Sequence, residues 1–131
     1  MRLLIDTQIF IWTVLDSNKL VLKARQIMLD ADEVFVSAAS IWEIAIKTKI
    51  GKIEGNPYEF MEAIKESGFR ELIISAKHAA KVHELPLYHR DPFDRLLIAQ
   101  TLTEPMRFLT ADSILKQYSE LVIMVPRGKI T

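Results

Sequence analysis

Short apolar runs alternate along this chain with stretches whose apolar residues recur at helical spacing, and this alternation constrains the fold most strongly. Residues 3–5 form the first apolar run and residues 33–36 the second. Strands separated by helices pair in parallel through right-handed crossovers. The runs are continuously apolar, as expected for strands that are covered on both faces. The sequence therefore predicts an α/β fold, a three-layer sandwich around a short parallel sheet.

The same patterns give the expected extent of each element. The expected strands cover residues 3–5, 33–36, 71–75, 108–109 and 121–125. The expected helices cover residues 7–15, 20–29, 57–68, 76–85, 92–102 and 112–118, and one more begins at its cap Ser37 and ends near Gly51.

Length and composition narrow the class of protein. The 131 residues are expected to form one domain, residues 1–131, with a hydrophobic content of 50% that suffices for a core. The chain has no cysteine, which excludes disulfide frameworks and thiol chemistry and is compatible with the cytoplasm. No apolar run approaches the ~20 residues of a membrane span, so no membrane association is expected.

Several acidic residues follow predicted strands, at the sheet edge where α/β proteins bind ligands. Asp6 comes directly after residues 3–5, and Asp112 shortly after residues 108–109. Each is also a plausible helix N-cap. Asp91 and Asp94 flank Pro92 in a pattern typical of a helix start, with Asp91 as the cap. Asp94 could serve the helix dipole or point into a cleft.

Glu43 is a lone acid within a mostly apolar predicted helix. One interpretation places it on a narrow solvated stripe, paired with Lys47 one turn later. The other buries it as part of a site, because a buried glutamate requires a partner or a metal ion. The sequence leaves both interpretations open.

Together these acids predict a metal site. Carboxylates that lie close together repel one another and raise each other's pKa, and a divalent cation relieves this repulsion. Oxygen ligands, without cysteine or a suitably spaced histidine pair, favour Mg²⁺ or Mn²⁺, as one or two ions. Carboxylate-held metals suit attack by water on a phosphodiester bond.

The charge balance is compatible with a polyanionic substrate. Lys plus Arg and Asp plus Glu both number 17, so bulk charge does not hold the protein to nucleic acid. Without Asp6, Glu43, Asp94 and Asp112 the balance is 17 bases to 13 acids, a surplus of +4. Cations near these acids could contact phosphates without reading sequence: Lys47, Lys49, Lys52, Arg90 and Arg95.

Four segments in order resemble the PIN-domain family, and more closely its VapC-type ribonuclease toxins from toxin–antitoxin pairs. They are Leu4-Ile5-Asp6-Thr7, the stretch VSAASIWEIAIK at 36–47 with Gly51-Lys52 after it, HRDPFDRLLIAQ at 89–100, and Leu109-Thr110-Ala111-Asp112. The resemblance covers nearly the whole chain. It implies an α/β/α sandwich in which Asp6, Glu43, Asp94 and Asp112 form the acidic metal site.

The resemblance also implies supporting residues and partners. Thr7 and Thr110 would be the hydroxyl residues that accompany the first and last acids, and Asp91 would cap or support the site. Gln8 departs from the pattern, because histidine is common there in this subgroup. The family implies an RNA substrate, a homodimer and an antitoxin whose tail covers the site.

Two other function classes remain as alternatives. A catalytically silent PIN-like module would bind RNA or a protein through the same groove. A phosphohydrolase of haloacid-dehalogenase type would need a second acid two residues after Asp6, where this chain has Gln8.

The aromatic and histidine residues receive mainly structural interpretations. Trp12 and Trp42 are expected in the core or a dimer interface rather than stacked on bases. His78 and His83 lack metal-ligand spacing, so surface or structural roles are favoured for them. His89 could contact substrate from its loop beside Asp91 and Asp94, but a structural role is favoured.

Overall fold

The computed structural model describes residues 1–129. The strands are β1 (Arg2–Ile5), β2 (Glu33–Ser37), β3 (Arg70–Leu72), β4 (Arg107–Thr110) and β5 (Val122–Met124). The α-helices are α1 (Thr7–Val14), α2 (Leu22–Asp30), α3 (Ala38–Lys49), α4 (Pro57–Glu66), α5 (Ala76–Lys81) and α6 (Pro92–Thr103). Two 3₁₀ helices complete the fold, η1 (Val82–Glu84) and η2 (Ser113–Tyr118).

The five strands form one sheet in the order β3-β2-β1-β4-β5, and every pair is parallel. β1 is central, and its register pairs Ile5 with Val36 on one side and with Leu109 on the other. The chain builds outward from β1 to β3, then crosses to β4 on the opposite side. The carboxyl ends of β1 and β4 therefore flank the point where the strand order reverses, where ligands of such sheets bind.

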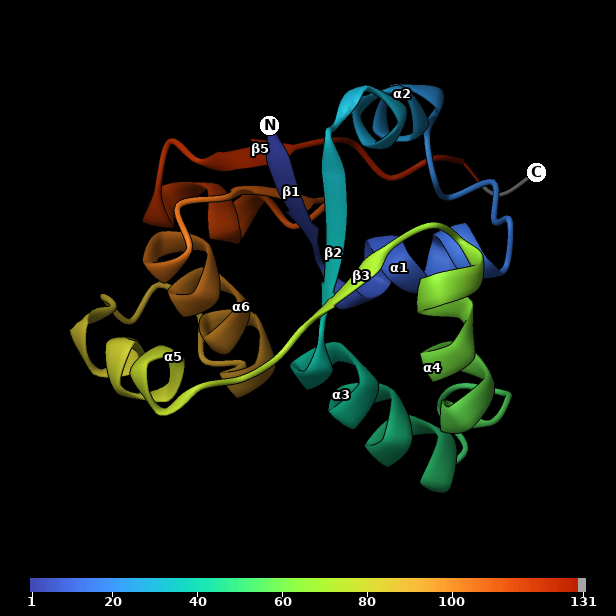
Figure 1. Cartoon of the computed structure of the whole chain (residues 1–131), viewed down its shortest axis with the longest axis horizontal. Coiled ribbons are helices and arrows are strands. Elements are labelled where there is room, and N and C mark those ends of the chain that lie inside the picture. Colours follow the sequence, from blue (N-terminus) through green and yellow to red (C-terminus); the bar gives the residue numbers. More distant parts are fainter. Residues whose placement is uncertain (130–131) are drawn as a thin grey trace.

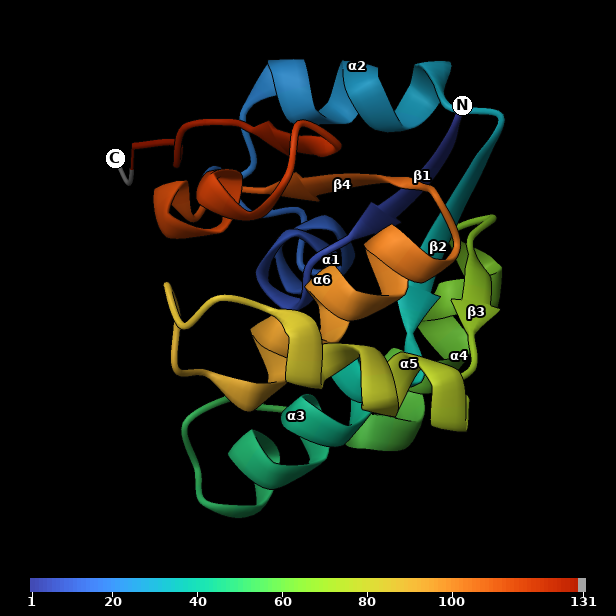
Figure 2. The same cartoon turned by 90° about the vertical axis from the view of Figure 1, so that its left-hand side faces the viewer.

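Helices cover both faces of the sheet, which confirms the predicted three-layer α/β/α sandwich. In Figure 1, α5 and α6 lie to one side of the strands, with α1 and α4 on the other; Figure 2 looks from the side of α5 and α6. Side chains alternate across the central strand: Leu3 and Ile5 join the core with α1, α2 and α4, and Leu4 joins the core with α6. No helix of the described part of the chain is long and apolar enough to cross a membrane.

The structure corrects the predicted strand at 71–75. β3 ends at Leu72, because the chain beyond it turns to other partners. The carbonyl of Ile73 accepts a hydrogen bond from Gln100 on α6, and the backbone N–H of Ser75 donates to His78. Ser75 thereby caps α5 in a capping box, and buried His78 also contacts Glu104, so of the two predicted roles for His78 the structural one holds.

Two segments that were predicted as α-helices contain 3₁₀ helix instead. The expected helix at 76–85 divides into α5 and the 3₁₀ turn η1, and the helix at 112–118 is the 3₁₀ helix η2. The expected domain, residues 1–131, includes two residues at the C-terminus, 130 and 131, that lie outside the described part.

Candidate active site

Asp6 occupies the carboxyl end of the central strand, where it begins α1. Its Oδ1 accepts a hydrogen bond from the backbone N–H of Ile9 at 2.7 Å, so the predicted cap is confirmed. Its Oδ2 accepts a hydrogen bond from the hydroxyl of Thr110 at 2.5 Å. Because the residue is also buried, these bonds fix the carboxylate in one position.

Thr110 and Asp112 follow from the adjacent strand β4. The backbone N–H of Asp112 donates to Oγ1 of Thr110 at 3.0 Å, so one hydroxyl links the first and last acids. Asp112 Oδ1 accepts from the N–H of Ile114 at 3.0 Å, which confirms its predicted cap. Its second oxygen, Oδ2, faces the cleft and lies 3.1 Å from Nε2 of His89.

For Glu43 the structure confirms the burial and the pairing with Lys47, whereas the solvated stripe of the first interpretation is wrong. Its Oε2 lies 2.6 Å from Nζ of Lys47, one helical turn later. The residue is nevertheless only 7% exposed, and its Oε1 is buried without a hydrogen-bond partner among the described residues. A buried carboxylate oxygen without a donor is costly, so this atom indicates a missing cationic partner.

Asp91 and Asp94 divide two roles at the start of α6. Oδ1 of Asp91 accepts from the backbone N–H of Asp94 at 2.9 Å, which confirms the predicted cap. The Asp94 side chain is therefore not needed as a cap and faces the other acids.

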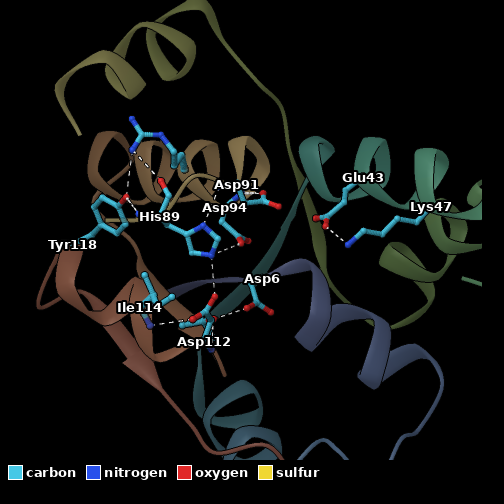
Figure 3. A network of polar contacts seen from close by, with 11 residues as sticks. Asp6, Glu43, Lys47, His89, Asp91, Asp94, Asp112, Ile114 and Tyr118 are labelled. Atoms are coloured by element: carbon cyan, nitrogen blue, oxygen red, sulfur yellow. Dashed lines mark hydrogen bonds and ion pairs between the residues drawn. The ribbon is translucent and has the colours of Figure 1, made fainter. Parts of the chain in front are cut away.

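These side chains line one cleft of about 490 Å³. Figure 3 shows Glu43 approaching from α3, opposite Asp6, Asp94 and Asp112. The sequence-predicted residues Asp6, Thr7, Glu43, Lys47, Asp91, Asp94 and Asp112 all line it, as does Gln8. Four acids from four separate parts of the chain thus face a common space.

The acids perturb one another's protonation. Burial raises the pKa of Asp6 to about 6, against the hydrogen bonds from Thr110 and Ile9, and the charges of Glu43 and Asp112 raise it further. Burial raises the pKa of Asp94 to about 8, with the charges of Asp91 and then the other three acids adding to the shift. The cleft is thus an arrangement of carboxylates that lacks sufficient positive charge.

A hard divalent cation fits this donor set. The carboxylates supply oxygen ligands, Glu43 Oε1 has no other partner, and neutralisation would lower the raised pKa values. Ligand atoms of Asp94, Asp112 and His89 also lie within 4.8 Å of one another.

His89 lies closer to this site than its structural interpretation from the sequence suggested. Its Nε2 is 3.1 Å from Oδ2 of Asp112 and 3.4 Å from Oδ2 of Asp94 (Figure 3). Its Nδ1 accepts a hydrogen bond from the backbone N–H of Asp91 at 3.0 Å. The sequence offered one sign of a role in the site, because His89 stands two residues before Asp91. The direction of the imidazole ring, however, depends on the conformation of the loop before α6.

The hydrogen bond at Nδ1 decides what the imidazole can do. Because Nδ1 uses its lone pair as an acceptor, the proton of the neutral ring lies on Nε2. A metal ligand would need the Nε2 lone pair instead. In this conformation His89 is a hydrogen-bond donor to oxygen atoms in the cleft, and the carboxylates are the candidate ligands.

Other predicted residues have their polar contacts outside the acid cluster. Thr7 lines the cleft, but its hydroxyl donates to Ser40 at 2.8 Å and ties α1 to α3. Arg95 does not line the cleft; its guanidinium donates to backbone carbonyls of the loop before α6, including Pro86 at 2.9 Å. Lys49 and Lys52 are exposed and also lie outside the cleft.

Comparison with known families identifies the chain. The family model described as "PIN domain" matches residues 3–121. The chain belongs to the PIN-domain family. This membership sets aside the haloacid-dehalogenase alternative. No curated protein matches the sequence.

Two solved structures share the PIN fold of this chain. One is a VapBC2 complex from Rickettsia felis bound to a DNA fragment from their promoter; it has 14% identity and a TM-score of 0.66, over 98% of this chain and 100% of that chain. The other is a toxin–antitoxin complex from Klebsiella pneumoniae, with 17% identity and a TM-score of 0.66, over 92% and 95%. At these identities the likeness establishes the fold.

Proposed function

We propose that this PIN-domain protein is a metal-dependent endoribonuclease and the toxin of a toxin–antitoxin pair, acting in the cytoplasm as one domain. The observation that carries the proposal is the convergence of Asp6, Glu43, Asp94 and Asp112 on one cleft at the switch point of the sheet. Carboxylates without a metal repel RNA, so a binding module would gain nothing from this arrangement.

The four acids would hold one or two Mg²⁺ or Mn²⁺ ions. When bound, the metal lowers the pKa of water and offsets negative charge at the phosphodiester. Thr110 holds Asp6 in place, and Asp91 fixes the first turn of α6 and hence Asp94. The Nε2–H of His89 is directed at the same oxygen-lined space and can donate to a phosphate oxygen there.

An antitoxin and a second copy of the chain are the proposed partners. Both similar structures are toxin–antitoxin complexes, which supports an antitoxin. An antitoxin segment over the cleft would exclude RNA from the acids.

The deciding experiment is cleavage of a mixed tRNA and total RNA pool by purified protein with Mg²⁺, Mn²⁺ or EDTA. Asp6→Asn is the matched control, because asparagine retains the helix cap at this position. We expect cleavage that requires both metal and Asp6, with a loss of at least about 100-fold in the variant. An Asp6→Asn protein as active as wild type would contradict the assignment.

No cleavage by folded, antitoxin-free wild type would instead favour the silent binding module. Calorimetry with Mn²⁺ separates the two, since only the nuclease requires the metal.

A further inference from the structure

The cleft does not end at the acids. Its wall continues past Gln8 and Ser113 to Trp12 and Arg127, which are not among the acidic residues of the candidate metal site. Arg127 belongs to the tail after β5, so the far end of the chain contributes a cation to the cleft. Backbone hydrogen bonds and the Trp12 ring hold this cation in a fixed position.

The tail reaches the cleft along a defined path. Beyond β5 it runs back toward the connection between α1 and α2 (Figure 1). The N–H of Val125 donates to the carbonyl of Thr110 at 2.9 Å, and that of Gly128 donates to the carbonyl of Lys19 at 2.8 Å. Arg127 itself forms an antiparallel bridge with Leu20. The backbone of Arg127 is therefore held on both sides.

Gly128 makes this close approach possible. A Cβ at this position would lie 2.1 Å from the backbone oxygen of Asn18. Any other residue would push the tail away from the α1–α2 connection. The position of Arg127 therefore depends on the presence of glycine at residue 128.

The side chain of Arg127 is positioned as well. Its guanidinium carbon lies 5.2 Å from the centre of the Trp12 ring. Trp12 lies on α1, is only 3% exposed and packs in the core, so it is a rigid support rather than a free surface for a base. A cation–π contact of this kind uses the positive charge and the ring face, and it does not use up the N–H donors of the guanidinium as hydrogen bonds.

Arg127 forms no ion pair with the described acidic residues of the cleft. Among residues 1–129 no carboxylate lies within ion-pair distance of it. A planar set of donors beside, but not bonded to, a carboxylate cluster suits a phosphate that is bidentately bound. Since the whole chain has zero net charge, local cations of this kind must attract a polyanion.

We propose that Arg127, supported by Trp12, is a phosphate-binding position for the RNA backbone, next to the phosphodiester that faces the acids. The inference rests on the proposed function for its ligand. It assigns to the C-terminal tail a part in holding the strand, independent of base identity.

The test is binding of fluorescent single-stranded RNA oligonucleotides, measured by anisotropy in Mg²⁺ over a range of salt concentrations. All proteins carry Asp6→Asn so that the RNA stays intact. We expect Arg127→Gln to raise Kd about 5- to 20-fold for every sequence tested and to reduce the salt slope by about 0.7, the value for one phosphate contact on a single strand.

Three further variants sharpen the result. Gly128→Ala keeps the charge but displaces the tail, so it should weaken binding nearly as much as Arg127→Gln. Arg127→Lys should retain the salt slope and lose part of the affinity. Arg70→Gln removes an arginine from the opposite edge of the sheet, outside the cleft, and should leave Kd unchanged.

The outcomes separate this inference from the proposed function. Unchanged Kd in Arg127→Gln, or an equal loss in Arg70→Gln, overturns the inference even if the wild type cleaves RNA. Specific loss of binding at Arg127 with no cleavage by wild type supports the phosphate position and overturns the nuclease.

Discussion

At the scale of single residues, the chemistry of the cleft depends on which atoms are already engaged in hydrogen bonds. Asp6, Asp91 and Asp112 each use one carboxylate oxygen as a helix cap. Asp6 and Asp112 retain a second oxygen directed at the site, so capping and site roles coexist in one side chain. For these acids the two interpretations of the sequence were not exclusive.

His89 gives the first prediction at this scale. If its Nε2–H donates to an oxygen in the cleft, His89→Gln should retain most of the RNA cleavage, because the glutamine amide can place a donor nearby. His89→Ala should lower kcat by about 10- to 100-fold. Mn²⁺ affinity, measured by calorimetry, should change less than about threefold in both variants. A large loss of Mn²⁺ affinity would show that His89 is a ligand.

The second prediction at this scale concerns Asp94 and the pH dependence of the free energy of unfolding. Its pKa of about 8 in the fold lies above its ordinary value of 3.8, so the native state binds a proton that the unfolded state lacks between these values. The metal-free protein should therefore lose stability as pH rises through this window. Asp94→Asn should flatten the loss in urea unfolding between pH 5 and pH 8, by at least about 1 kcal/mol. An unchanged pH profile in the variant would contradict the raised pKa.

At the scale of elements, Arg95 organises the loop that carries His89. Its guanidinium donates to the carbonyls of Val82, Pro86 and His89, and it also contacts the hydroxyl of Tyr118. One side chain on α6 thus fixes η1 and the loop relative to η2. The residue positions the site without contacting it.

We therefore expect Arg95→Ala to destabilise the protein by about 1–3 kcal/mol, since several carbonyls lose a charged donor. Amide hydrogen exchange should accelerate in residues 82–90 more than elsewhere. Arg90→Ala, an exposed neighbour, is the matched control and should change stability by less than about 0.5 kcal/mol. Equal effects of both substitutions would argue against the bracing role.

At the scale of the whole molecule, we expect the thermal stability of the protein to depend on divalent cations bound in the acidic cleft. Metal binding to the native state alone should raise Tm, with about 2.7 kcal/mol of stabilisation at a concentration 100 times Kd. We expect Mn²⁺ to raise Tm of wild type in thermal unfolding followed by circular dichroism. The double variant Asp6→Asn, Asp94→Asn should show little of this shift, and an equal shift would place the metal elsewhere.

One exposed aromatic side chain, Trp42, is a candidate contact for the proposed homodimer. Trp42 is 57% exposed, so its predicted place in the core is wrong. Its ring lies edge-on to that of Phe93, with 4.9 Å between the ring centroids. Its predicted place in a dimer interface stays a prediction. We expect Trp42→Glu to raise the dimer dissociation constant at least about 10-fold in sedimentation experiments. Leu29→Glu, on exposed α2, should have no effect. Dissociation by Leu29→Glu instead would place the interface on α2.

The sequence by itself determined most of the elements, the caps and the candidate acids, but not the end of β3 or the 3₁₀ geometry of η1 and η2. Hydrophobic spacing and cap chemistry act over a few residues, so β1, α3 and the Asp91 cap could be predicted locally, and the order of strands and helices brought the acids to one sheet edge. Only the tertiary structure decided where long-range partners lie. The direction of Arg95, the Nε2 of His89 beside Asp112, and Arg127 on Trp12 depend on contacts between segments far apart in the chain, which no local pattern encodes.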